Sequence, residues 1–184
     1  MASLLPTPRL PERTEGLTLL ELMTVIVIMS ILLVMLVPVI SGIKGRMEKA
    51  NCTSTMRGIH VAASAYLTDH KMWPQVDAGL LSHDSEEYAR QWIAEFAPYG
   101  LTEKEWHCPT VERLSDSKRK HGESPKLHID YIATPFDSRE MTPRLWTRQP
   151  WFVERGNVHG NGNLMIFMDG SVIELAEFLR TPVN

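Results

Sequence analysis

The chain has 184 residues, a formal net charge of -3 and a hydrophobic content of 43%. That length fits one modest domain with appendages, because domains most often contain about 100 to 150 residues. Acidic and basic residues nearly balance, so no strong electrostatic field attracts nucleic acid, and nucleic acid is not an expected partner.

A long apolar run near the N-terminus, from Leu22 to Ile43, contains no charged residue. As a helix it would rise about 33 Å, enough for a hydrocarbon core of about 30 Å. The competing interpretation is a secretory signal peptide, whose apolar region is about 7 to 15 residues long and precedes an A-x-A-like site. Here the run is longer and no such site follows it. The sequence therefore predicts a single membrane-spanning helix.

The residues just before this run form an unusual junction. Gly16 precedes Leu17, and Glu21 is a lone carboxylate at the start of the apolar run. An acidic side chain at the centre of a membrane helix costs about 2.5 to 3.5 kcal/mol, and less near an end. A partner for Glu21 is therefore expected. The alternative is an ordinary anchor in which the Glu21 side chain extends to the membrane interface.

The residues G-L-T-L-L-E at positions 16–21 resemble the processing site of type IV prepilins and type II secretion pseudopilins, in which G-F-T-L-x-E leads into the helix. The resemblance implies that a prepilin peptidase removes the leader 1–16 by cutting between Gly16 and Leu17. It also implies that the same enzyme N-methylates Leu17, although Leu17 replaces the usual Phe. Glu21 would then pair with this amino group on a neighbouring subunit.

The resemblance further implies the surroundings of the chain. The partners would be the peptidase and N-methyltransferase, other pilin or pseudopilin subunits, an inner-membrane assembly platform and membrane lipid. The chain would cross the bacterial inner membrane once through residues 17–43, with its N-terminus cytoplasmic and residues 44–184 periplasmic until assembly. Lys44, Arg46 and Lys49 after the apolar run favour the opposite orientation by the positive-inside rule. Pro38 predicts a helix kink, or is a proline that the helix tolerates.

Beyond the apolar run, apolar residues recur at steps of four and three, which indicates one face of a continuing helix. They are Cys52, Met56, Ile59, Ala63 and Tyr66. We expect this spine helix to occupy residues 44–73. Asp84 and Glu87 form a capping pattern for a second helix over 84–97, whose aromatic residues recur every four positions and fit a core better than a ligand site.

Residues 115–126 are charged and predict a solvated loop. Alternating apolar residues predict an antiparallel sheet over 127–176, with a type I′ hairpin turn at Asp169 and Gly170. The expected fold is therefore α+β and pilin-like. Its long N-terminal helix would span a membrane in the first half, be amphipathic in the second, and pack against a small antiparallel sheet.

The two cysteines, Cys52 and Cys108, predict a possible disulfide in an exported domain, and the alternative is two free buried thiols. His159, Asp169 and Gly170 resemble the H-X9-DG segment near the C-terminus of one branch of prepilin-type proteins. We expect Asp169 to serve the turn and His159 to form a structural hydrogen bond. The alternative is a metal or catalytic role, for which two groups alone make an incomplete site.

The remaining residues give no cofactor or enzyme prediction. His121, His128 and Asp130 have no recognisable ligand spacing, so no metal is expected. Some pseudopilins bind calcium in an acidic C-terminal loop, for which we find no equivalent. Two hypotheses remain: a structural subunit of a secretion pseudopilus or type IV pilus-like filament, and a membrane-tethered exported ligand-binding or catalytic domain. The register of Gly16 and Glu21 favours the first, because an anchor requires neither residue.

Overall fold

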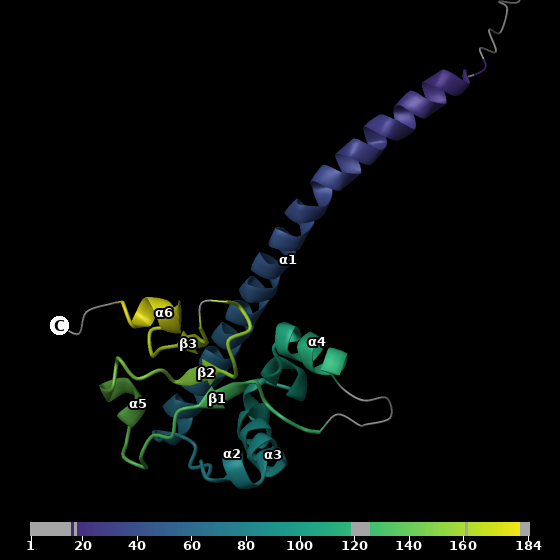
Figure 1. The fold of residues 1–184 in the computed structure, drawn as a ribbon. Helices are drawn as coiled ribbons and strands as arrows, with labels where there is room; N and C mark the ends of the chain where they lie inside the picture. The colour runs from purple at the N-terminus through teal and green to yellow at the C-terminus, as the bar shows by residue number, and fades with distance from the viewer. Residues whose placement is uncertain (1–15, 17, 119–125, 161, 181–184) are drawn as a thin grey trace, which may run out of the picture. The chain divides into compact units, whose positions relative to one another are not determined.

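The computed structural model describes residues 16, 18–118, 126–160 and 162–180, apart from the side chains of 36–42 and 116–118. The chain divides into two compact units, residues 1–43 and 44–184. Helix α1, Leu19–His70, belongs to both units, and every other helix and strand belongs to the second (Figure 1). The second unit is α+β.

The expected membrane-spanning segment is not supported. Within the described residues, no helix is both long enough and apolar enough to cross a membrane. The continuous stretch of helix in the first unit whose side chains are described, residues 19–35, is mostly apolar but includes Glu21, Thr24 and Ser30, and its rise is only about 25 Å. This finding overturns the membrane-spanning half of the predicted fold, and with it the expected single-pass localisation in an inner membrane.

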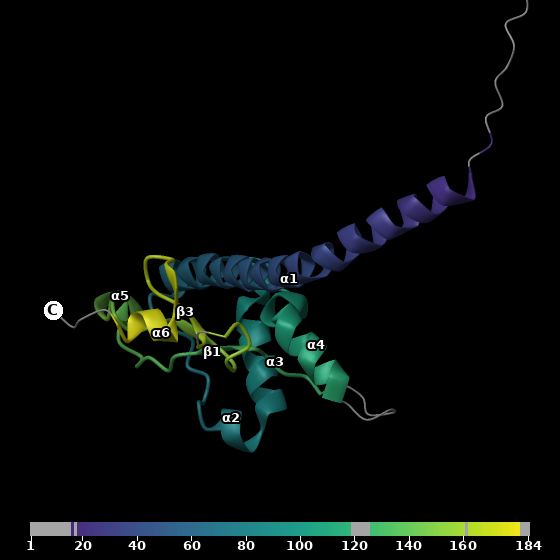
Figure 2. The same ribbon diagram turned by 45° about the horizontal axis from the view of Figure 1, so that its top comes forward.

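The sheet of the second unit has four antiparallel strands in the order β1-β2-β3-β4. Each strand has three residues: β1 Tyr131–Ala133, β2 Phe152–Glu154, β3 Leu164–Ile166 and β4 Val172–Glu174. The C-terminal half of α1 lies along one side of this unit, and the sheet and shorter helices lie on the other (Figure 2). The buried stripe of α1 consists of apolar residues spaced by four or three: Cys52, Met56, Ile59, Ala63 and Leu67.

The shorter helices are α2 Leu80–His83, α3 Ser85–Phe96, η1 Ala97–Tyr99, η2 Glu103–Trp106, α4 Pro109–Lys118, α5 Thr142–Leu145 and α6 Leu175–Phe178. The helices from α2 to α4 lie between α1 and β1 in the chain, α5 lies between β1 and β2, and α6 follows β4. The helix expected over 84–97 is α3, and the Asp84 carboxylate accepts a 3.0 Å hydrogen bond from the Glu87 amide. The loop expected over 115–126 begins inside the last turns of α4, and residues 119–125 lie outside the described part.

Aromatic side chains form the centre of the second unit. Phe152 on β2 lies with its ring centroid 5.6 to 6.2 Å from the rings of four residues: Trp73, Trp92, Phe96 and Trp106. All five side chains are buried. The aromatic stripe of α3 is thus part of the hydrophobic core, where large rings bury much apolar area and pack edge to face.

The turn between β3 and β4 differs from the expected type I′ turn. The Gly170 amide donates to the Phe167 carbonyl, and the Phe167 amide donates to the Ser171 carbonyl. Gly170 has a φ of 77°, whereas Asp169 is not among the described residues with positive φ. A type I′ turn needs positive φ at both central residues. The three-residue loop 168–170 is instead a tight turn closed by a left-handed glycine.

We expect Phe152→Ala to destabilise the protein by about 3 to 5 kcal/mol, since it leaves a cavity among four aromatic rings. Leu145→Ala, at a side chain that is 74% exposed, is the control and should change stability by no more than about 0.5 kcal/mol. Chemical denaturation of the full chain, followed by circular dichroism, measures both. Equal denaturation midpoints for the two variants would contradict this assignment of the core.

Candidate functional site

The first described turn of α1 is closed by a reciprocal cap between Thr18 and Glu21. The Thr18 amide and hydroxyl each donate to Glu21 Oε2 at 2.9 Å, and the Glu21 amide donates to the Thr18 hydroxyl at 3.2 Å. This is a capping box, in which side chains satisfy amides that the first helical turn leaves free. The backbone and side-chain hydrogen bonds from Thr18 lower the pKa of Glu21.

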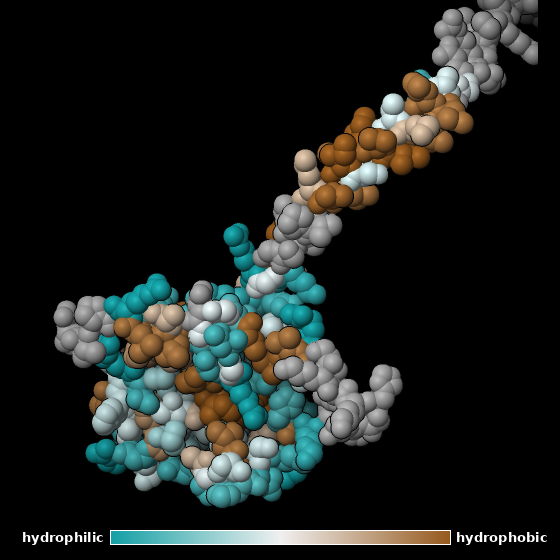
Figure 3. All heavy atoms as spheres, in the orientation of Figure 1, coloured by the Kyte–Doolittle hydropathy of each residue, from teal (hydrophilic) through white to brown (hydrophobic). Residues whose placement is uncertain are grey.

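The helix that follows this cap is apolar on every side. The large apolar side chains from Leu19 to Met35 are each between 51% and 76% exposed in the chain alone. Brown side chains cover most of the face of this part of α1 that Figure 3 shows, with a few paler residues among them. A soluble surface helix has one apolar stripe, whereas a helix that is apolar all round is normally buried. This apolar surface therefore needs to be buried against other apolar groups, and the described residues of the first unit do not bury it.

The structure describes the residues at the expected cleavage and kink positions only in part. Gly16 is exposed, and a side chain added there would meet no atom within 4 Å. Leu17, the expected new N-terminus, lies outside the described residues. The backbone of Pro38 is part of α1, but its side chain falls in the stretch 36–42 that is not described. Cleavage, methylation and the kink therefore stay predictions.

In the second unit, the two cysteines meet a carboxylate and an imidazole. The Sγ atoms of Cys52 and Cys108 are 2.6 Å apart, and both cysteines are free. Four side chains offer ligand atoms that all lie within 4.8 Å of one another: Cys52, Cys108, Glu154 and His159. We call them the Cys–Glu–His cluster. The predicted disulfide is not formed in this structure and stays a prediction.

His159 connects the other members of the cluster. Its Nε2 atom lies 3.2 Å from Glu154 Oε1 and 3.8 Å from Cys108 Sγ. Asp169, at the other end of the H-X9-DG segment, accepts a 2.9 Å hydrogen bond from the Ser171 amide, which lowers its pKa. The two residues of this segment therefore have different roles: His159 contacts the cluster, and Asp169 closes the β3–β4 turn.

Burial and mutual contact shift the acidity of the cluster. Burial raises the pKa of Glu154 to about 7, and the neighbouring Cys108 thiol adds to this effect. The hydrogen bond between the two cysteines raises the pKa of Cys108 and lowers the pKa of Cys52.

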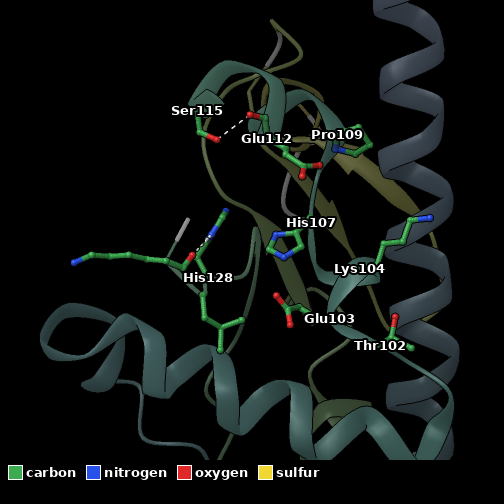
Figure 4. Close-up of a pocket in the computed structure, with 10 residues that line it drawn as sticks. Thr102, Glu103, Lys104, His107, Pro109, Glu112, Ser115 and His128 are labelled. Atoms are coloured by element: carbon green, nitrogen blue, oxygen red, sulfur yellow. Dashed lines mark hydrogen bonds between the residues drawn. The ribbon is translucent and has the colours of Figure 1, made fainter. Parts of the chain in front are cut away.

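A second group of polar side chains lines a neighbouring pocket. Asp130 is fully buried, accepts a 2.8 Å hydrogen bond from the Cys108 amide, and lies 3.8 Å from His107 and 3.7 Å from His128. The hydrogen bond to Asp130 raises the pKa of His107. Figure 4 shows His107 and Glu103 pointing into the pocket, with Glu112 above them. Of His121, His128 and Asp130, which have no recognisable ligand spacing in the sequence, His128 and Asp130 lie close together, and His121 lies outside the described residues.

Sequence reasoning missed Glu154, the carboxylate of the Cys–Glu–His cluster. The available signal was the alternation of β2, because residues two apart in a strand face the same side. Phe152 and Glu154 are both buried and Val153 between them is half-buried. A carboxylate in register with a buried phenylalanine predicts either a buried polar partner or a metal ion.

No protein-family model, curated protein or solved structure matches the chain.

Contacts of Glu48 hold α4, and therefore the preceding Cys108, against α1. Glu48 Oε2 accepts hydrogen bonds from Arg113 at 2.9 Å and Thr110 at 3.2 Å. Partial burial disfavours ionisation, but these hydrogen bonds outweigh it and lower the pKa of Glu48. A carboxyl group whose pKa falls on folding stabilises the folded state above its unfolded pKa, and this contribution is lost as pH falls.

We therefore expect Glu48→Gln to lower the free energy of unfolding at neutral pH. The difference from the unsubstituted chain should shrink as pH falls from about 4.5 through the lowered pKa of Glu48. Denaturant titrations of the full chain at a series of pH values measure it. Glu103→Gln, at an exposed side chain, is the control. A difference that stays constant down to the acid limit would show that charge on Glu48 is not involved.

Proposed function

We propose that this chain is a structural subunit of a prepilin-like filament, a pseudopilin or minor pilin. A prepilin peptidase cuts it between Gly16 and Leu17, and residues 19–35 then assemble with the same helix of neighbouring subunits. The observation that carries the proposal is the helix that is apolar on all sides directly after the Thr18–Glu21 cap. The resemblance of residues 16–21 to a prepilin processing site supports it.

The distribution of apolar residues around the helix favours several neighbours over one. A single partner helix covers one stripe, as in a coiled coil with apolar residues at two of every seven positions. Here Val25, Ile26, Val27 and Ile28 are consecutive, point in all directions, and are more than half exposed. Each buried Å² of this surface contributes about 25 cal/mol. Packing among several subunit helices, as in a filament, covers all of it.

Glu21 gives this assembly its direction and register. A carboxylate enclosed by apolar helices is costly unless a positive charge pairs with it. Cleavage after Gly16 would create a positive amino group on Leu17, close in sequence to Glu21. Both hydrogen bonds from Thr18 end on Glu21 Oε2, so the cap leaves Oε1 for an amino group of a neighbouring subunit.

Cleavage is tested by co-expressing the full chain with a prepilin peptidase and sequencing its N-terminus by tandem mass spectrometry. We expect a chain that begins at Leu17, and Gly16→Leu should block its formation. Because Gly16 is exposed and a Cβ atom added there meets no atom within 4 Å, such a block reflects the peptidase and not the fold. A catalytically inactive peptidase is the control. An intact N-terminus at Met1 or Ala2 beside the active enzyme would contradict the proposal.

The role of Glu21 is tested with two variants that separate charge from capping. Glu21→Gln keeps a capping-box acceptor but removes the charge, whereas Thr18→Val removes the cap and keeps the charge. If the charge pairs in the filament, Glu21→Gln should still be cleaved but its share in sheared filaments should fall by about tenfold or more, since breaking a buried ion pair costs several kcal/mol. Thr18→Val should be affected less.

Glu105→Gln is the matched control, because Glu105 forms the same kind of capping box with Thr102 in the second unit. It should assemble normally. Normal incorporation of Glu21→Gln would remove the proposed charge pairing, and a larger loss for Thr18→Val would assign the effect to the cap.

A further inference from the structure

We propose that the Cys–Glu–His cluster binds one zinc ion that fastens together four segments of the second unit. The four donors are the kinds that zinc prefers, namely thiolate sulfur, imidazole nitrogen and carboxylate oxygen. They are supplied by Cys52, Cys108, Glu154 and His159, whose ligand atoms all lie within 4.8 Å of one another. Four protein donors fill a tetrahedral shell, which is typical of a structural site and not of a catalytic one.

The burial of these donors is a second, independent observation. Both cysteines are fully buried, Glu154 is 1% exposed, and the His159 side chain is 3% exposed. Glu154 Oε2 is buried and has no hydrogen-bond partner among the described residues. A buried carboxylate oxygen without a partner is costly, and a cation beside it removes that cost. Within the described part of the chain, the cluster therefore contains a buried carboxylate oxygen that no hydrogen-bond donor satisfies.

The donors come from three regions of the sequence, because Glu154 and His159 are only five residues apart. Cys52 lies on the buried stripe of α1, Cys108 precedes α4, Glu154 ends β2, and His159 lies in the β2–β3 loop. The Cys108 amide is held by Asp130, and the Glu154 carbonyl accepts a 2.8 Å hydrogen bond from Asn163. Outer contacts of this kind orient metal ligands. One ion would join the helix, the sheet and the loop.

The geometry also indicates what changes when the ion binds. Two sulfurs on one tetrahedral zinc are about 3.8 Å apart at Zn–S bonds of about 2.3 Å, whereas here they are 2.6 Å apart. They must separate by about 1 Å, which a small side-chain rotation of either cysteine provides. The two thiols lose their protons to solvent as the sulfur–zinc bonds form, and no electron is transferred.

The competing outcome is the disulfide that the sequence predicts. A disulfide would use both sulfurs and leave Glu154 and His159 to pair only with each other, with Glu154 Oε2 still lacking a partner. The second polar group, around His107, His128 and Asp130, offers three donors, of which two are part-exposed, and is not the site that we propose.

The test uses the full chain purified with a reductant and dialysed against zinc or cobalt(II). We expect about one zinc per chain by elemental mass spectrometry, and thiolate-to-metal charge-transfer bands in the cobalt spectrum. Cys108→Ser and His159→Gln should each weaken zinc binding by about tenfold or more. His128→Gln, in the neighbouring group, is the matched control and should bind as the unsubstituted chain does.

Circular dichroism of each variant distinguishes loss of a ligand from loss of the fold. If Cys108→Ser fails to fold, His159→Gln alone tests the metal site.

Three results would overturn the proposal. The first is a reduced chain that binds neither metal, and the second is a cobalt complex without thiolate bands. The third is an intact mass, measured without reductant, that lacks two hydrogens and carries no zinc.

Discussion

The packing of one face of α1 against the sheet and the aromatic core is the contact on which residues 44–180 depend. Strands of three residues cannot form a stable sheet alone, because small sheets need an apolar face against another element. The buried stripe of α1, which includes the fully buried Ala63, supplies that face. The aromatic rings around Phe152 fill the space between α3 and the sheet.

Polar residues of α1 beside this stripe each contact one segment of the sheet region. These contacts fix the position of the β3–β4 turn and of the end of β4. His60 Nε2 lies 2.8 Å from the Met168 carbonyl, and its ring stacks on Trp151, which holds the β3–β4 turn. Lys49 pairs with Glu174 at 2.8 Å at the end of β4. Such pairs contribute little energy individually when exposed. Their effect is positional, since apolar packing alone would not decide where each loop lies.

Much of this arrangement follows from periodicity in the sequence. The spine residues from Cys52 to Tyr66, the Asp84 cap and the hairpin at 169–170 are local patterns, and local patterns fix a helix face, a helix start or a turn. The turn type was wrong because Asp169 and Gly170 also fit a three-residue loop, in which only the glycine needs positive φ.

The buried carboxylates could not be predicted in the same way. Asp130 accepts a hydrogen bond from the backbone amide of Cys108, which is 22 residues away, and Glu154 lies in one cluster with Cys52 and Cys108, which are also far away in sequence. No composition rule anticipates such partners, and acidic residues are normally exposed. The strand alternation at β2 identifies the face of Glu154, but the presence of two sulfurs on that face depends on how α1 and α4 pack.

Cys52 links the chemistry of the cluster to the packing of α1. Successive residues of an α-helix are rotated by about 100°, so a slip of α1 by one residue would turn the whole buried stripe away from the core. The same slip would remove the Cys52 sulfur from Cys108 and His159. The apolar stripe and the cluster thus specify one common register of α1 against the sheet. The hydrophobicity of residues 19–35 specifies no rotation about the helix axis, because their exposed apolar side chains lie on all sides, and the proposed filament therefore assigns their register to Glu21.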